Sequence, residues 1–327
     1  MRDIVRRCTA ALAILGFATA APAQGDWPAG KTLKLVVPFG AGTGLDVLAR
    51  GYADRLGAQL HTGVVVENRE GAGGTIGTLA VAHAAPDGAT LLFTAHGPFA
   101  VAPYVQGGAT YDPVGDFAPI AKVAQTPMVL ITGAASRFRS FGDVVAYAKA
   151  NPGKLDYASS GVGAPSHMNM EVVKRELGLQ IAPVPYKSTG QAMTDVIGGR
   201  LALYMPSFPA ALPQLKAGQV RGLAIGSTKR SQVLPDIPTL AELLKKPGLN
   251  ANVWYGFLAP KGTPPVVLAR LHAEIAKAQA SPRIAALLEQ VGAEPVLVGP
   301  AEFEQQIQQD ATASRKLLQD LGAKLEK

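Results

Sequence analysis

The feature that most constrains this chain is a glycine-rich turn, Gly40–Asp46, set between an apolar strand and an amphipathic helix. Residues 33–38 are apolar enough for a buried strand. After the turn, residues spaced at i, i+3, i+4, i+7 and i+11 predict one face of a helix: Leu45, Leu48, Ala49, Tyr52 and Leu56. A glycine turn at the start of a helix exposes backbone N–H groups that favour an anion. The turn therefore predicts an anion-binding site in an α/β protein, without naming the anion.

Length and composition agree with this class of fold. The chain has 327 residues, enough for about two domains. Hydrophobic residues make up 48% and charged residues 17%, which excludes a disordered chain. Glycine is abundant, at 36 residues, and aromatic residues make up only 6%, a combination that favours many tight strand–helix turns. The basic residues form no run longer than a pair, so we expect no nucleic-acid binding.

The N-terminus predicts export. Basic residues precede an apolar segment, residues 9–20, that is too short to span a bilayer. Residues 21–23 read Ala-Pro-Ala, a pattern typical of cleavage sites, so we predict a signal peptide at residues 1–23 and a periplasmic protein; an uncleaved membrane anchor is the alternative. Cys8, the one cysteine, lies in this segment, so the mature chain needs no disulfide. The segment contributes a net +2 to the formal charge of +7, which leaves +5, a mild bias toward small anions.

Strands and helices alternate in two successive groups. The first hundred residues predict a β-α-β-α-β order, with a second glycine-rich turn at residues 68–74 and Thr75 as the N-cap of the helix after it. The pattern restarts near Lys122, and a third glycine-rich turn, residues 160–166, leads into another helix. After a strand that ends at Pro260, we expect helices only.

This order predicts two lobes. Lobe 1 would consist of residues 24–124 and 254–327, and lobe 2 of residues 125–253, because helices without a sheet of their own need to pack back on the first sheet. The chain would then cross twice between the lobes. A ligand would bind in a cleft where the glycine turns of the two lobes face each other.

Enzymatic functions fit the sequence poorly. The glycines of the first turn stand two apart and do not match the G-x-G-x-x-G spacing of dinucleotide-binding turns, and the stretch Gly71–Gly77 is off by one. The chain contains no G-x-S-x-G elbow of a serine hydrolase. Its five histidines lack the spacing of a zinc site. We therefore expect no catalysis, no cofactor and no metal; a secreted hydrolase or a dinucleotide-binding enzyme is the alternative.

Four single residues are open to more than one interpretation. His96, in a strand-exit loop, is either a cleft contact or a structural residue. For His167 we favour a helix-face histidine bonded to backbone over a ligand contact. We interpret Asp46 as an acceptor for N–H groups of the first turn rather than as a catalytic acid. For Arg69, a surface or hinge salt bridge competes with a ligand carboxylate.

Short motifs follow one another in a characteristic order along the mature chain. They read PFGAG (38–42), DVLAR (46–50), ENR (67–69), GAGG (71–74), YDP (111–113), DFAP (116–119), YASSG (157–161), VPYK (184–187), GGR (198–200), AG (217–218), KRS (229–231) and PDIPT (235–239). Each motif is common alone, but their order and spacing are specific. By these motifs, the chain from about Trp27 to its C-terminus resembles the Bug-type, TctC-like extracytoplasmic solute receptors of tripartite tricarboxylate transporters.

The resemblance implies a two-lobed periplasmic-binding-protein fold (type II-like) that closes on a small carboxylate, an organic, amino or aromatic acid, and serves membrane permease subunits. One ligand carboxylate would be held by the first and third turns, mostly through backbone N–H groups, hydroxyls and water. The far end of the ligand would face His96 and residues 205–208. The ligand-binding residues expected on this basis are Gly40, Ala41, Gly42, Thr43, Asp46, Thr75, His96, Ser160, Gly163, Ala164, Ser166 and Ser207. We expect a monomer.

Three departures from the family pattern bear on the ligand. Residues 42–45 read Gly-Thr-Gly-Leu where the family usually has paired glycines and a polar residue. Ala164 replaces a hydroxyl donor, a loss of about 1 kcal/mol if uncompensated. His96 and Ala102 replace a small polar residue and an asparagine. These departures argue against the commonest ligands of the family but not against its fold. A receptor for a neutral or cationic solute and a sensory receptor for a signalling partner are the alternatives among binding proteins.

Overall fold

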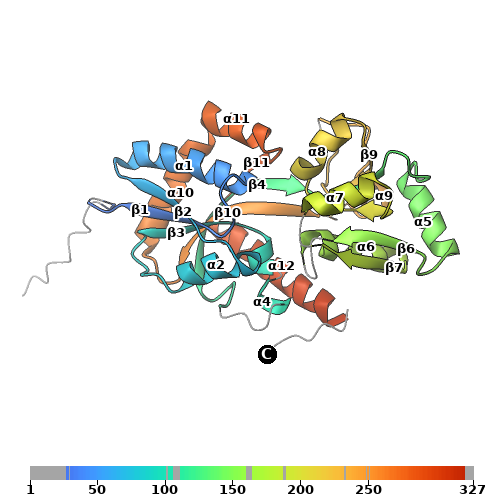
Figure 1. The fold of residues 1–327 in the computed structure, drawn as a ribbon. Helices are drawn as coiled ribbons and strands as arrows, with labels where there is room; N and C mark the ends of the chain where they lie inside the picture. Colours follow the sequence, from blue (N-terminus) through green and yellow to red (C-terminus); the bar gives the residue numbers. More distant parts are fainter. Residues whose placement is uncertain are drawn as a thin grey trace, which may run out of the picture.

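Figure 1 shows the computed structural model of the protein, which describes residues 27–28, 30–100, 102–105, 111–159, 164–186, 189–231, 233–247, 249 and 251–320. The predicted signal peptide and two predicted ligand residues, Ser160 and Gly163, lie outside the described residues. The described part forms two lobes that lie side by side, each built on its own β-sheet (Figure 1). None of its helices combines the length and the apolar character needed to traverse a membrane.

Lobe 1 is built on a six-stranded sheet with the order β11-β4-β10-β3-β1-β2. Its strands are β1 (Leu33–Val37), β2 (Val64–Asn68), β3 (Thr90–Ala95), β4 (Phe117–Pro127), β10 (Asn252–Pro260) and β11 (Glu294–Val298). β1 pairs in parallel with β2 and with β3, as the predicted β-α-β-α-β order requires. β10 runs antiparallel to β3 and β4, and β11 runs antiparallel to β4.

Side chains of the lobe-1 sheet alternate between two cores. Leu35 and Val37 on β1 face the side covered by α1 (Gly44–Leu60), α10 (Pro265–Gln279) and α11 (Pro282–Gln290). Val36 faces the opposite side. The elements on that side are α2 (Thr75–Ala82), α3 (Gly97–Ala100) and α12 (Pro300–Asp320). The five apolar residues predicted to form one face of α1 are all buried, at 5% exposure or less, which confirms that prediction.

Lobe 2 is built on a five-stranded sheet with the order β7-β6-β8-β5-β9. Its strands are β5 (Val129–Gly133), β6 (Leu155–Ser159), β7 (Ile181–Pro185), β8 (Leu203–Tyr204) and β9 (Val220–Ile225). Its helices are α5 (Phe141–Ala150), α6 (Pro165–Leu177), α7 (Thr189–Ile197), α8 (Phe208–Lys216) and α9 (Leu240–Leu243). Leu130 belongs to one apolar cluster, and Val129 and Ile131 belong to another, so this sheet is also packed on both faces.

The chain passes between the two sheets at two places that are joined by hydrogen bonds. β4 leads into β5 through Met128 alone, and β10 begins directly after Ala251. Gly226, after β9, donates its N–H to Met128 O (2.7 Å) and accepts from Ala251 N (2.7 Å). A methyl group on Gly226 would lie 2.7 Å from Ala251 Cβ, so the close approach requires glycine there.

The end of the chain differs from the prediction of helices only, which is wrong. Residues 294–298 form β11, an edge strand that pairs with β4. Its side chains alternate between half-buried and exposed, and Pro295 precedes an apolar run of only three residues, Val296–Val298, which is too short to identify a strand by itself. β4 itself begins at Phe117, five residues before the place where the sequence pattern restarts. Pairing with a distant strand, rather than a local pattern, defines this edge of the sheet.

Candidate functional site

The first turn is held in shape by its own polar groups. Thr43 is the N-cap of α1, because its hydroxyl accepts a hydrogen bond from Asp46 N (3.3 Å) and donates one to Gly40 O (2.9 Å). Gly42 has a φ of 80°, a left-handed conformation that favours glycine. The Thr43 hydroxyl, expected to contact the ligand, is thus engaged within the turn. The T-x-x-D spacing of a helix cap is the sequence signal for this role.

Asp46 lies at the centre of the hydrogen-bond network behind the turn and is 3% exposed. Its Oδ2 accepts from Gly42 N (2.9 Å) and Arg50 Nε (3.0 Å), and its Oδ1 accepts from Asn68 Nδ2 (3.0 Å). Burial alone raises the pKa of Asp46, but the hydrogen bonds from Arg50, Gly42 and Asn68 outweigh burial and hold the pKa below its ordinary value. The Asp46 carboxylate therefore organises the turn, in agreement with its interpretation as an acceptor for turn N–H groups.

Asn68 and Arg50 connect the first turn to the second, and neither is among the site residues expected from the sequence. Asn68 Nδ2 donates to Phe39 O (3.0 Å) as well as to Asp46, and Asn68 Oδ1 accepts from Arg50 Nη2 (3.0 Å). The i, i+4 spacing of Asp46 and Arg50 is the available signal for one of these contacts. The contacts of Asn68 join the ENR motif to the DVLAR and PFGAG motifs, and Arg50 and Asn68 lie 18 residues apart in the chain.

The first turn presents backbone N–H groups to solvent. Within the described residues, the N–H groups of Ala41, Thr43 and Gly44 have no hydrogen-bond acceptor, and all three residues are exposed. They gather at the positive end of α1, a helix of 17 residues. In Figure 1, this end of α1 points toward lobe 2. The arrangement suits an anion that enters between the lobes.

The second turn packs against the loop that follows β3. It contains a 3-10 turn, η1 (Ala72–Gly74), and Gly74, not Thr75, is the N-cap of α2, so that prediction is wrong by one residue. Gly74 has a φ of 96°, and a methyl group there would lie 2.7 Å from Pro98 Cγ, so a residue with a side chain does not fit. Thr75 is the first helical residue. Its hydroxyl oxygen is buried near the Tyr111 hydroxyl, outside hydrogen-bond geometry, and is directed into lobe 1.

His96 lies at the end of β3, between Trp254 on β10 and Asp310 on α12. Its Nε2 lies 3.5 Å from Asp310 Oδ2, which also accepts a hydrogen bond from Trp254 Nε1 (2.8 Å), and its ring lies edge-on to Trp254. Burial lowers the pKa of His96, and the charge of Asp310 acts in the opposite direction. Its Nδ1 is buried without a hydrogen-bond partner in the described part of the chain. His96 is therefore partly committed to lobe-1 packing, and one of its ring nitrogens is not bonded by any described residue.

On lobe 2, the described part of the third turn begins at Ala164. This residue is the N-cap of α6 and has no side chain to cap the helix. Ser166 and His167, which follow it, are only 1% and 6% exposed. His167 stacks on Tyr157, and the Tyr157 hydroxyl donates to Glu171 Oε1 (2.7 Å). His167 therefore belongs to a buried cluster within lobe 2.

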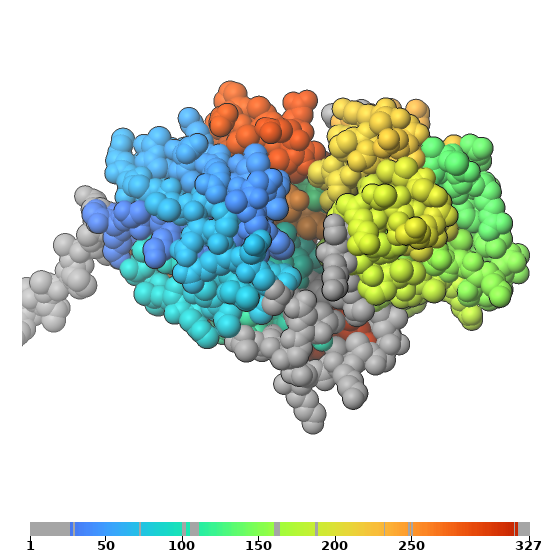
Figure 2. Space-filling view, viewed as in Figure 1, coloured from blue at the N-terminus to red at the C-terminus, as the bar shows by residue number. Residues whose placement is uncertain are grey.

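Ser207 is the N-cap of α8, and its hydroxyl makes no capping bond. Two residues later, Pro209 touches lobe 1, since a methyl group on Gly292, just after α11, would lie 3.3 Å from Pro209 Cγ. A methyl group on Gly44 would lie 3.4 Å from Val291 Cβ in the same stretch. This series of contacts brings the start of α8 close to the first turn, and Figure 2 shows a narrow hollow between the lobes that carry them.

Comparison with known proteins decides the family. The model of the tripartite tricarboxylate transporter family receptor matches residues 48–323. The chain belongs to the tripartite tricarboxylate transporter receptor family. One relative of the receptor, Protein BugT of Bordetella pertussis, is 34% identical over 323 residues, which cover 97% of this chain and 99% of BugT.

Solved structures of similar proteins share the two-lobed fold of the receptor. A protein of R. palustris solved with adipate has a TM-score of 0.77 and 32% identity, with 90% of this chain and 98% of that chain covered. MatC from Rhodopseudomonas palustris with bound malate has a TM-score of 0.73 and 28% identity, with 89% and 99% covered. The receptor is therefore a solute-binding protein of the Bug and TctC type, which confirms the family and the fold class predicted from the motifs.

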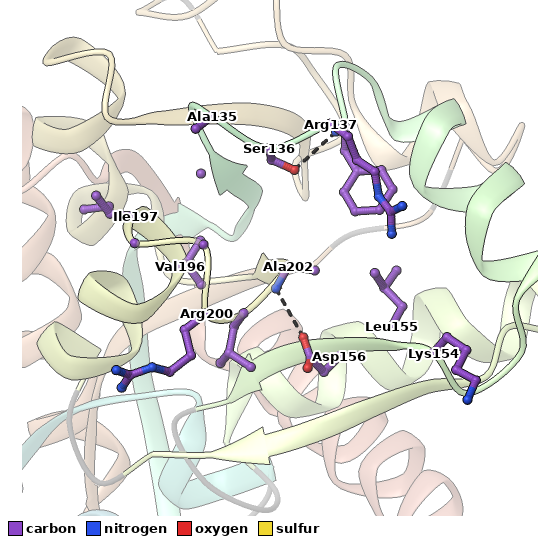
Figure 3. A pocket seen from close by; sticks show the side chains of 15 residues that line it. Ala135, Ser136, Arg137, Lys154, Leu155, Asp156, Val196, Ile197, Arg200 and Ala202 are labelled. Atoms are coloured by element: carbon purple, nitrogen blue, oxygen red, sulfur yellow. Dashed lines mark hydrogen bonds between the residues drawn. The ribbon is translucent and has the colours of Figure 1, made fainter.

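A separate cavity of about 390 Å³ lies on lobe 2 of the receptor, where β5, β6 and the end of α7 meet (Figure 3). None of the ligand residues expected from the sequence is among its lining residues. Three of its four charged side chains already have partners: Asp156 accepts from Ala202 N (3.2 Å), Arg200 pairs with Asp195 (3.1 Å), and Arg137 lies over the Tyr147 ring (3.8 Å). We therefore assign no ligand to this cavity.

Proposed function

We propose that this receptor captures a small carboxylate in the cleft between its lobes and delivers it, chemically unchanged, to the membrane permease subunits of a tripartite tricarboxylate-type transporter. The observation that carries the proposal is the cluster of exposed N–H groups at Ala41, Thr43 and Gly44. Behind them, the charge of Asp46 is balanced by Arg50 at 3.0 Å, so the helix end remains attractive to an anion. The adipate and malate in the structures of the two relatives support a carboxylate ligand.

We infer that one carboxylate of the ligand lies against Gly40–Thr43 on lobe 1 and against residues 160–166 on lobe 2. Thr43, Asp46 and Thr75 would contribute by shaping the turns, since their side-chain oxygens are engaged or buried within lobe 1. The far end of the ligand would lie toward Nδ1 of His96, which no described residue bonds, and toward Ser207, whose hydroxyl is not used as a cap.

Closure of the lobes would occur where the chain crosses between the sheets. The hydrogen bonds of Gly226 to Met128 and Ala251 hold the two crossings together, so the lobes would rotate about a single hinge at this place. On this basis we propose the lobe boundaries at residues 124–125 and 253–254. We also propose that the receptor works as a monomer in the periplasm after removal of residues 1–23.

Calorimetry against a panel of mono-, di- and tricarboxylates is the direct test of this function. We expect saturable binding of at least one acid by the mature protein, with one site per chain. Mass spectrometry of ligand that co-purifies with the protein would name candidates for the panel. Binding of no carboxylate at all would refute the proposal, and turnover of a bound acid would refute the non-enzymatic role.

A charge placed in the first turn tests its role in the site. Gly42→Asp should weaken carboxylate binding by at least about tenfold, because it adds a negative charge beside the exposed N–H groups. Gly42→Asn is the matched control, since asparagine has the same size and tolerates the left-handed φ of 80°. If the two variants bind a carboxylate equally well, the first turn is not the anion site.

A further inference from the structure

Glu70 lies directly against the first turn. A methyl group on Gly40 would lie 2.7 Å from Glu70 Oε2 and 3.8 Å from its Cδ, so the carboxylate rests on the bare Cα of Gly40. Glu70 is exposed, and no cation pairs with it among the described residues. The second turn thus brings a free carboxylate to the place where the first turn begins.

The remaining charges of the two turns are already balanced. Asp46 pairs with Arg50 at 3.0 Å, and Glu67 pairs with Arg69 at 2.6 Å. Glu70 is therefore the one charged side chain of these turns without an opposite charge in the described part of the chain. A ligand that offers only carboxylates would bring a negative charge beside it, which is unfavourable at short range.

The adjacent exposed N–H groups attract a negative group at the same time. The exposed N–H group of Ala41 directly follows Gly40, the residue against which the Glu70 carboxylate lies. A position that attracts an anion and an unpaired carboxylate are therefore adjacent. The chemistry that satisfies both is a carboxylate and an ammonium group on the same carbon. An α-amino acid has this arrangement, whereas the same acid without its amino group leaves Glu70 unpaired.

We propose that Glu70 is a specificity-determining residue that binds the α-ammonium group of the ligand, so that the receptor prefers an α-amino acid to the corresponding acid without the amino group. This inference rests on the proposed function, because it requires the ligand carboxylate to lie at the first turn. It identifies the ligand class within the range of carboxylates that the sequence leaves open.

The test uses pairs of ligands that differ only in the amino group, measured by calorimetry on the mature protein. Suitable pairs are aspartate with succinate, glutamate with glutarate, and phenylalanine with 3-phenylpropionate. We expect the wild type to bind the amino acid of at least one pair about tenfold more tightly or better, as one added ion pair at a partly desolvated site provides. Glu70→Gln should remove most of this preference while the affinity for the acid without the amino group stays equal or rises.

Glu67→Gln is the matched control, because Glu67 lies three residues away and already pairs with Arg69. This variant should keep the preference within about twofold, which lies inside ordinary variation for a surface change. Equal affinity of the wild type for both members of every pair that binds, or a preference that survives in Glu70→Gln, overturns the inference and leaves the carboxylate receptor intact. Failure of both members of every pair and of the wider acid panel overturns the proposed function as well.

Discussion

Replacement of Asp46 by asparagine gives the sharpest test of the architecture of the first turn. In the Asp46→Asn variant, one carboxylate oxygen becomes an amide NH₂ group of similar size. At Oδ2 this group would face Gly42 N and Arg50 Nε, and at Oδ1 it would face Asn68 Nδ2 and Arg50 Nη2. In either orientation of the amide, its NH₂ group faces two N–H donors, so rotation of the amide does not restore the lost hydrogen bonds.

The magnitude follows from these contacts. The bond from a neutral donor, Gly42 N or Asn68 Nδ2, contributes about 1.5–3 kcal/mol because the buried acceptor is charged. The bond from Arg50 contributes about 0–1 kcal/mol, since its side chain is 53% exposed. We therefore expect Asp46→Asn to lower the free energy of unfolding by about 1.5–4 kcal/mol.

Urea denaturation followed by circular dichroism measures this change. Asp54→Asn is the matched control, because Asp54 lies on the same helix, is exposed and has no partner in the described part of the chain. The control should stay within about 0.5 kcal/mol of the wild type. If Asp46→Asn is as stable as Asp54→Asn, the network around Asp46 does not hold the turn together.

Three further predictions concern other parts of the molecule. The folded-state pKa of Asp46 is depressed, so the contribution of Asp46 to stability is complete above the ordinary pKa of 3.8 and is lost as the pH falls through the lower folded value. The stability difference between wild type and Asp46→Asn should therefore shrink on acidification. Urea titrations at successive pH values measure this difference, and a constant difference would contradict the prediction. Gly226→Val should destabilise the protein by about 1–3 kcal/mol in thermal melts, because its Cβ would lie 2.7 Å from Ala251 Cβ, whereas Gly97→Ala, with nothing within 4 Å, should be nearly neutral. Tyr157→Phe should cost about 1–2 kcal/mol by removing the buried donor to Glu171, and an effect no larger than that of Tyr147→Phe would speak against a structural role for that bond.

The role of a residue in the candidate site can be predicted from the sequence only where contacts with its neighbours along the chain determine that role. Asp46 lies on the first turn of a predicted helix, directly behind a glycine turn, and its acceptor role is read from that position. The capping role of Thr43 could have been predicted in the same way, since its spacing to Asp46 is that of a helix cap. The contact of Glu70 with Gly40 could not be predicted in this way, because no periodicity relates residues on two different turns 30 positions apart.

The same limit explains the position of His96. Its place at the end of a strand is predictable from the apolar run before it, yet its partner Asp310 lies on the last helix, more than two hundred residues later. A sequence pattern therefore left His96 open between two interpretations. The contacts of His96 with Asp310 and Trp254 arise only because β3, β10 and α12 pack together.

By itself, the sequence determined the alternation of strands and helices, the apolar face of α1, the glycine turn before it and the order of motifs that identifies the family. These features depend on local periodicity, on backbone conformations that only glycine adopts readily, and on motif order, all of which are written along the chain. The tertiary structure alone decided the pairing of β4 with β11, the network that joins Asp46 to Asn68, and the approach of Glu70 to the first turn. Those features depend on contacts between segments that are distant in the sequence, and such contacts contribute to stability only once the lobes are packed.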